Sequence, residues 1–266
     1  MKRGRMACAG LITLLGGILL SQPPSYGDDK KKHDYNACAK GITLANDEQE
    51  INAIAQKSKA HKIFVDFLKN PQTWAAMLKT IDERADFYSD NVQIVVKLVP
   101  TGNYGLGRGV LGHGTMILNY ENMARAISLS RGSVDPPQKI ITHELCHIFH
   151  AAKISLPLFL NEGMAEYVAM KEDQLGPYFD SKKEVKNLDE SVNIGFDERY
   201  ARGLIFFKYL DSKYKQASAK KFIVLTCLQE KDYKEGLQEI TGKSWEKILK
   251  EELEWARQFV NSRGKQ

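Results

Sequence analysis

The chain has 266 residues with 38 basic and 33 acidic side chains, a formal net charge of +5 at pH 7. Three of the basic residues lie within positions 1–27, which hold no acidic residue, so the remaining chain has 35 basic against 33 acidic side chains, a net charge of +2. Nucleic-acid-binding domains are normally much more basic, and this class is therefore disfavoured. The 239 residues that remain (266 minus 27) suffice for one large domain or two small lobes with a sizeable core.

The N-terminal segment has the three-part pattern of a signal peptide. Lys2, Arg3 and Arg5 precede an apolar run over 6–20, and small residues with helix breakers follow up to Gly27. The apolar run is shorter than the ~18 residues expected of a membrane-spanning helix. We therefore expect residues 1–27 to be cleaved and the protein to be secreted or periplasmic. An uncleaved segment that anchors the protein to the membrane is the alternative.

The next predicted elements alternate between helix and strand. Residues 43–60 predict a mostly polar helix, and 61–68 predict a strand because apolar and polar residues alternate. Residues 70–90 predict a helix with Asn70 as its cap and a proline at its first position. Residues 91–100 are rich in β-branched residues and predict another strand.

Six glycines lie between positions 102 and 114. This density predicts bulges and open loops where another backbone approaches closely. A phosphate-binding loop is excluded because the segment lacks the Gly-Lys-Ser/Thr ending of such loops. His113 within this segment is interpreted as structural.

Two helices are predicted after the glycine-rich segment. The first begins with Asp135 as its cap and Pro136 at its first position, and it ends before Pro157. The second opens with Asn161 as its cap. From about residue 197 the pattern is helical to the end of the chain.

The motif HELCH at 143–147 carries the chemistry of the first helix. His143 and His147 are four residues apart, so both imidazoles leave the same face of a helix, and two imidazoles can bind one zinc ion. Glu144 is placed to accept a proton from a metal-bound water. Cys146 lies about 100° around the helix from His147 and is expected to point into the core rather than bind the metal.

The helix cannot supply a third ligand by itself. His150 lies ~10 Å further along the axis than His143, too far for one straight helix to hold all three around a metal, and it is interpreted as a packing residue. Glu162 and Glu166 are four apart on the second helix, and either one can complete a site with two histidines and a carboxylate. The other can orient a ligand histidine through its second nitrogen. Spacing alone leaves this choice open.

The combination of HELCH with LFLNEGMAEYVA resembles the gluzincin metalloproteases, most closely the compact peptidase MA-like families. The resemblance implies that Glu162, the glutamate of the Asn-Glu-Gly element, is the third zinc ligand and that Glu166 orients a ligand histidine. It also implies an oxyanion-stabilising role for Tyr200, in a Tyr-x-Arg-Gly element that has Arg202 where the aminopeptidases have lysine. The exopeptidase motif of the aminopeptidases is missing.

The predicted fold class is therefore α+β, with a small twisted N-terminal sheet, the HExxH helix packed on it, and a helical C-terminal lobe as in thermolysin. In chain order, the predicted organisation is a signal peptide at 1–27, a polar leader and helix at 28–60, and a metallopeptidase domain at 61–266. The domain has its sheet part at about 61–135, zinc helices at 136–170 and a helical lobe at about 197–260. The predicted function is hydrolysis of a peptide or protein substrate with one Zn²⁺ per chain. A catalytically silent scaffold of the cell envelope is the alternative.

Three cysteines follow residue 27, namely Cys38, Cys146 and Cys227. Three are too few for a disulfide scaffold, so the fold is expected to rest on its core. A disulfide between Cys38 and Cys227 is left open by the sequence.

Overall fold

The structure, a computed structural model of the chain, describes residues 33–150, 156–170, 188, 196–214 and 217–263. The predicted signal peptide lies outside these residues. Among the described helices, none is long and apolar enough to cross a membrane. The described residues form a mainly helical fold with a small four-stranded sheet, which confirms the α+β class.

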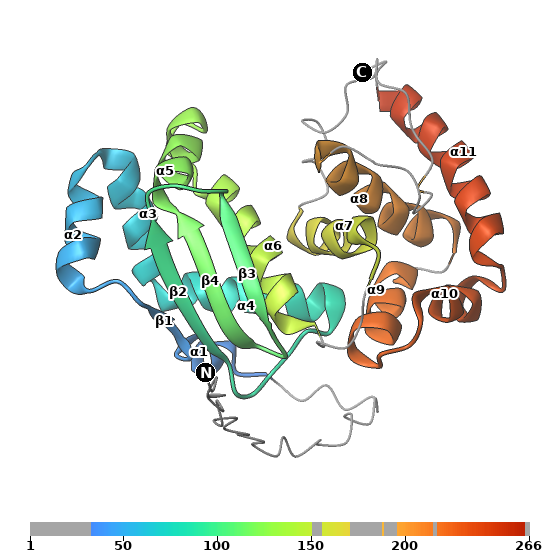
Figure 1. Ribbon diagram of the computed structural model, residues 1–266, viewed down its shortest axis with the longest axis horizontal. Helices are drawn as coiled ribbons and strands as arrows, with labels where there is room; N and C mark the ends of the chain where they lie inside the picture. Colours follow the sequence, from blue (N-terminus) through green and yellow to red (C-terminus); the bar gives the residue numbers. More distant parts are fainter. Residues whose placement is uncertain (1–32, 151–155, 171–187, 189–195, 215–216, 264–266) are drawn as a thin grey trace, which may run out of the picture. The chain divides into compact units, whose positions relative to one another are not determined.

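The sheet has three parallel strands and one antiparallel strand at its edge (Figure 1). Its order is β1-β2-β4-β3, with bounds β1 (Ile42–Leu44), β2 (Gln93–Val99), β3 (Gly105–Val110) and β4 (His113–Asn119). The strand β1 lies within the segment predicted as a polar leader and helix, so the sheet begins earlier in the chain than predicted. The strand predicted over 91–100 is confirmed as β2.

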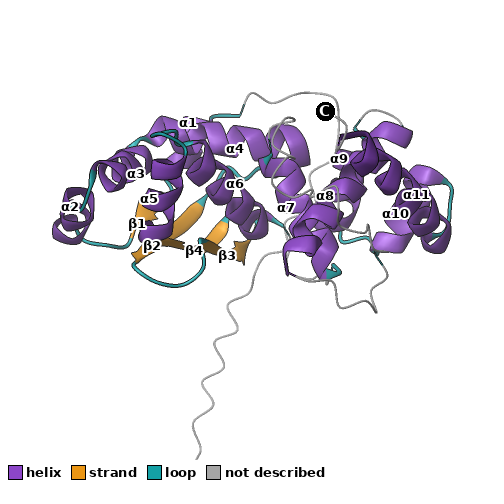
Figure 2. Ribbon diagram, turned by 90° about the horizontal axis from the view of Figure 1, so that it is seen from above, coloured by secondary structure: helices purple, strands orange, loops and turns teal. Residues whose placement is uncertain are grey.

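One face of the sheet is covered by helices, as Figure 2 shows. The covered face of β2 carries Ile94, Val96 and Leu98, all of which are buried, while the residues between them are exposed. This alternation follows from the two-residue period of a strand. On the opposite face Val95 and Ile117 remain about two-fifths exposed, at 43% and 38%.

Five helices accompany the strands in the first half of the described chain. They are α1 (Tyr35–Ala39), α2 (Glu48–Gln56), α3 (Lys59–Lys69), α4 (Pro71–Ala85) and α5 (Tyr120–Leu129). The helix α4 begins as predicted, because the side chain of Asn70 accepts a hydrogen bond from the Gln72 backbone.

The prediction of a strand over 61–68 is wrong, because this segment belongs to α3. Its buried residues come in pairs at helical spacing, including Phe64 with Val65 and Phe67 with Leu68, so the same letters that alternate locally also form one helical face. Ser58 caps the helix by accepting a hydrogen bond from the His61 backbone.

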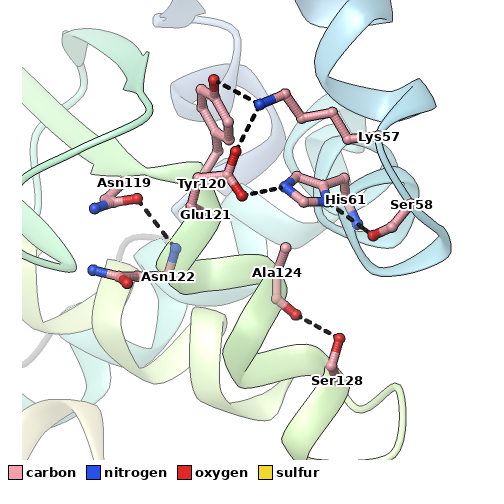
Figure 3. Close-up of polar contacts among 9 residues, drawn as sticks. All are labelled: Lys57, Ser58, His61, Asn119, Tyr120, Glu121, Asn122, Ala124 and Ser128. Carbon is pink, nitrogen blue, oxygen red and sulfur yellow. Dashed lines mark hydrogen bonds and ion pairs between the residues drawn. The ribbon is translucent and has the colours of Figure 1, made fainter.

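Polar contacts join α3 to α5 (Figure 3). His61 places Nδ1 2.8 Å from the Ser58 hydroxyl and Nε2 3.1 Å from Glu121 Oε2. Lys57 donates to the other oxygen of Glu121 at 2.6 Å. Ser58 is also the N-cap of α3, and Glu121 lies in the first turn of α5. These contacts are therefore explained by the packing of the N-terminal ends of α3 and α5.

The two motif helices are α6 (Asp135–Phe149) and α7 (Leu158–Ala169). Asp135 is the first residue of α6 rather than its N-cap, which is Val134. The backbone N–H of Asp135 donates to the Ser133 hydroxyl. The prediction of Asn161 as a cap is wrong, because α7 begins three residues earlier, directly after Pro157. Proline is tolerated at this position because its ring fixes φ and the N–H that it lacks would have no partner within the helix.

The C-terminal part is helical, as predicted. It comprises α8 (Phe196–Lys213), α9 (Ser218–Ile223), a π-helical turn η2 (Val224–Leu228), α10 (Tyr233–Thr241) and α11 (Trp245–Arg263). The cysteines Cys38, Cys146 and Cys227 are buried and free, so the disulfide left open by the sequence is not formed.

Candidate metal centre

The two motif histidines lie one turn apart on α6 and direct the same ring atom to one point. Their Nε2 atoms are 3.1 Å apart, and the ring planes are nearly perpendicular at 77°. The side chain of His143 is 7% exposed and that of His147 is 13% exposed. If one of these nitrogens carries the ring proton it can donate to the other, and if neither does, both lone pairs are available to a cation.

Glu162 brings a carboxylate to the same point from α7. Its Oε2 lies 3.1 Å from His143 Nε2 and 3.5 Å from His147 Nε2. In the part of the chain that the structure describes, these three residues form the one group able to hold a metal, with ligand atoms within 4.8 Å of one another. Two imidazoles and one carboxylate are the donor set of a zinc site that keeps a position for water. The residues present therefore fit a divalent zinc ion.

Glu166 lies one turn beyond Glu162 and meets the far side of the His143 ring. Its Oε1 is 3.1 Å from His143 Nδ1, and its Oε2 is 2.9 Å from the ammonium group of Lys139. The carboxylate is 6% exposed. The spacing of the two glutamates left their roles open. In this geometry Glu162 lies beside the Nε2 atoms of both histidines, whereas Glu166 lies beside Nδ1 of His143.

The electrostatics of the centre favour a positive charge at His143. Burial opposes a charge on His143, but the carboxylates of Glu162 and Glu166 outweigh burial and raise its pKa to about 9. Burial likewise opposes ionisation of Glu162, yet contacts with His143 and His147 lower its pKa. For Glu166, burial is outweighed by His143 and Lys139, which hold its pKa below the usual range. Two ionised carboxylates around paired imidazoles are suited to a cation.

Glu144 follows the first motif histidine on α6, and its carboxylate is hydrogen-bonded to the edge strand β3. The backbone N–H of Gly107 donates to Glu144 Oε2 at 2.6 Å. A Cβ atom on Gly107 would lie 2.3 Å from the Glu144 carbonyl oxygen, and one on Gly105 would lie 2.8 Å from Glu144 Cγ. The predicted close approach of another backbone is therefore found. Four of the six glycines lie within the paired strands β3 and β4, whereas Gly102 and Gly112 lie in the connections beside them with positive φ. Alternate glycines of β3 let α6 pack against its backbone.

Glycines also fix the crossing of α7 and α8. A Cβ atom on Gly163 would lie 2.3 Å from the backbone of Gly203, and one on Gly203 would lie 2.1 Å from the carbonyl oxygen of Phe159. Both glycines belong to the quoted motifs, one to Asn-Glu-Gly and the other to Tyr-x-Arg-Gly. The motif letters therefore encode a contact between two helix backbones beside the metal-binding residues.

This crossing brings Tyr200 to the centre. Its ring centroid is 5.6 Å from that of His143. Burial and the hydrogen-bonded Glu162 carboxylate raise the pKa of Tyr200, so its hydroxyl remains protonated and able to donate at neutral pH. Arg202 is turned elsewhere, because its guanidinium forms a bidentate pair with the buried Glu252 of α11, at 2.9 and 2.6 Å.

Two further contacts hold α7 in place. Arg84 of α4 donates to the carbonyl oxygens of Tyr167 at 3.1 Å and Val168 at 3.2 Å, both in the last turn of α7, and it also contacts that of Met170. The hydroxyl of Tyr167 donates to Asp211 of α8 at 2.6 Å. A positive group at the C-terminal end of a helix is stabilised by the helix dipole.

Other candidate residues lie outside the centre. His150 is the C-cap residue of α6, with its ring centroid 6.4 Å from that of His147, and is not in the metal-binding group. Cys146 is fully buried, as predicted, and its thiol contacts the Thr142 carbonyl oxygen. His113 is a half-buried residue of β4 that is paired with Val110.

Sequence reasoning missed Lys139 and Arg84, both of which contact α7. The signal for Lys139 is its position four residues before His143, on the same helical face. Arg84 gives no signal, because its partners are backbone carbonyls more than 80 residues away.

In comparisons with known proteins, no family model matches the chain, and neither the curated proteins nor the solved structures gave a match.

Proposed function

We propose that this protein is a zinc-dependent peptidase of the gluzincin type. The observation that carries the proposal is the convergence of His143 Nε2, His147 Nε2 and Glu162 Oε2 within 4.8 Å. A catalytic centre also needs a base and an oriented ligand. We assign the first role to Glu144, the neighbour of His143 on α6, and the second is supported by the Glu166 carboxylate, whose Oε1 is 3.1 Å from His143 Nδ1. The resemblance of the HELCH and Asn-Glu-Gly elements to gluzincins supports the same chemistry.

Each residue has a distinct role in the proposed reaction. Bound zinc would lower the pKa of its water and polarise the scissile carbonyl. Glu144 accepts the proton of the attacking water and passes it to the leaving amine. The hydrogen bond from Gly107 fixes one oxygen of Glu144, which leaves the other for the proton. The hydroxyl of Tyr200 donates a hydrogen bond to the oxyanion that develops on the substrate.

A peptide is the proposed substrate because the edge strand β3 lies directly beside the catalytic base. An extended peptide can add to the edge of a sheet through backbone hydrogen bonds. Such pairing would hold the scissile bond near Glu144 whatever side chains the peptide carries. We expect the protein to act after export, in the secreted or periplasmic space.

The first test is the zinc content of the purified protein, measured by mass spectrometry after zinc loading and removal of excess metal. We expect about one zinc ion per chain in the wild type and none retained in Glu162→Ala, because two imidazoles alone bind zinc weakly. Glu121 of α5 provides a control because it is not in the metal-binding group, and Glu121→Ala should keep the metal. A wild type without zinc would refute the proposal. Zinc retained by Glu162→Ala would move the third ligand to Glu166.

Replacing Glu166 by alanine is expected to weaken zinc binding by about 10- to 100-fold without abolishing it. The imidazole of His143 would lose the carboxylate that meets its Nδ1 atom at 3.1 Å. Competition against a chromophoric chelator at fixed pH measures the change in Kd. An unchanged Kd would show that Glu166 does not support the ligand.

A further inference from the structure

Lys139 lies one helical turn before His143 on α6. Residues four apart on a helix are neighbours on its surface. The Lys139 ammonium group is 2.9 Å from Glu166 Oε2, and the other oxygen of the same carboxylate is 3.1 Å from His143 Nδ1. One carboxylate from α7 therefore bridges two successive turns of α6.

The bridge is shielded from solvent. The side chains are 18% exposed for Lys139, 6% for Glu166 and 7% for His143. An exposed ion pair contributes little, but a buried carboxylate needs partners for both of its oxygens. Without the lysine, one oxygen of Glu166 would lose its cationic neighbour. The carboxylate could then rotate to find another polar partner.

The direction of the His143 ring depends on this carboxylate. A ligand histidine presents one nitrogen to the metal when a partner holds the other nitrogen. Here Glu166 faces Nδ1, which leaves Nε2 directed at Glu162 and His147. A rotation of Glu166 would release the ring from this orientation.

We propose that Lys139 is a positioning residue of the metal centre, which fixes Glu166 in the rotamer that orients His143 toward the metal. This inference rests on the proposed zinc site. It differs from a purely structural role, in which the ion pair only joins α6 to α7. A structural role would change the stability of the metal-free protein. The positioning role changes zinc affinity, and it does so only while Glu166 is present.

The test is a double-mutant cycle on zinc affinity, with Lys139→Met, Glu166→Ala and the combined variant. Zinc Kd is measured by chelator competition at fixed pH, and thermal unfolding of the metal-free proteins is measured in parallel. We expect Lys139→Met to weaken zinc binding by about 10-fold, the lower end of the range for outer partners of a metal ligand. Lys139→Arg should restore most of the affinity. In the Glu166→Ala background, Lys139→Met should have no further effect.

The control variant is Lys62→Met, which breaks an exposed ion pair with Asp66 and should leave zinc Kd unchanged. If Lys139→Met does not fold, Lys139→Gln replaces it in the cycle. Wild-type affinity in the Lys139 variant, or an equal loss with and without Glu166, would overturn the inference while the zinc site stands. A wild type that binds no zinc would overturn the proposed function as well.

Discussion

Glu144→Gln is expected to lower kcat/KM for peptide hydrolysis by about 10²- to 10⁴-fold, the usual contribution of a general base. The amide has the same shape and its oxygen can still accept the hydrogen bond from Gly107, but it cannot take a proton from water. Glu144 is not part of the metal-binding group, so zinc content should stay the same as in the wild type. Hydrolysis is measured with the zinc-loaded protein on a library of internally quenched peptides.

The matched control for this variant is Glu121→Gln, which makes the same chemical change on a partly exposed glutamate of α5 that is not in the metal-binding group. It should leave both hydrolysis and zinc content unchanged. Full hydrolysis by Glu144→Gln would remove this residue from the proposed mechanism. Loss of zinc together with hydrolysis would identify Glu144 as a ligand or as a residue required for folding.

The geometry of the candidate site was largely predictable because its chemistry is local in sequence. His143 and His147 are fixed relative to each other by the helix alone, since four residues make about one turn. Glu162 and Glu166 are related in the same way on α7. What spacing could not give is which of these glutamates meets which ring nitrogen. That depends on the angle between two helices, and the angle depends on contacts such as those of Arg84 and Gly203.

The fold was less predictable where apolar residues are dense. Residues 61–68 alternate as a strand does, yet Phe64, Val65 and Leu68 together form the buried face of a helix. Short apolar stretches satisfy both periods, and here the cap at Ser58 and packing against α5 favour the helix. The strand β1 was missed for another reason. Three residues give no period, and β1 is defined by its pairing with β2, about 50 residues later.

Glycines carried information that composition alone did not reveal. In β3 they recur at every second residue, so they share one face, and that face is where α6 packs. The glycines of the two later motifs are 40 residues apart in sequence and in direct backbone contact. Both cases show a small residue selected by the close approach of another backbone rather than by conformational freedom.

Gly163→Ala is therefore expected to destabilise the protein by about 3 kcal/mol or more, the upper end of the range for overpacking. The added methyl group would lie 2.3 Å from the Gly203 backbone, which cannot move aside as a side chain can. The helices α7 and α8 must separate, and this displaces Glu162 and Tyr200. We therefore expect weaker zinc binding together with lower stability, measured by chelator competition and by denaturant unfolding.

Gly236→Ala is the control for this substitution, because Gly236 also lies in a helix but has room for a methyl group. The nearest atom to its added Cβ would be Thr226 Cγ2 at 3.4 Å, an ordinary contact. Since alanine is a better helix former than glycine, this variant should be more stable than the wild type by up to about 1 kcal/mol. Opposite signs for the same chemical change would show that Gly163 is required by the helix crossing. Equal stability and equal zinc affinity in both variants would show that the crossing does not hold the metal-binding residues.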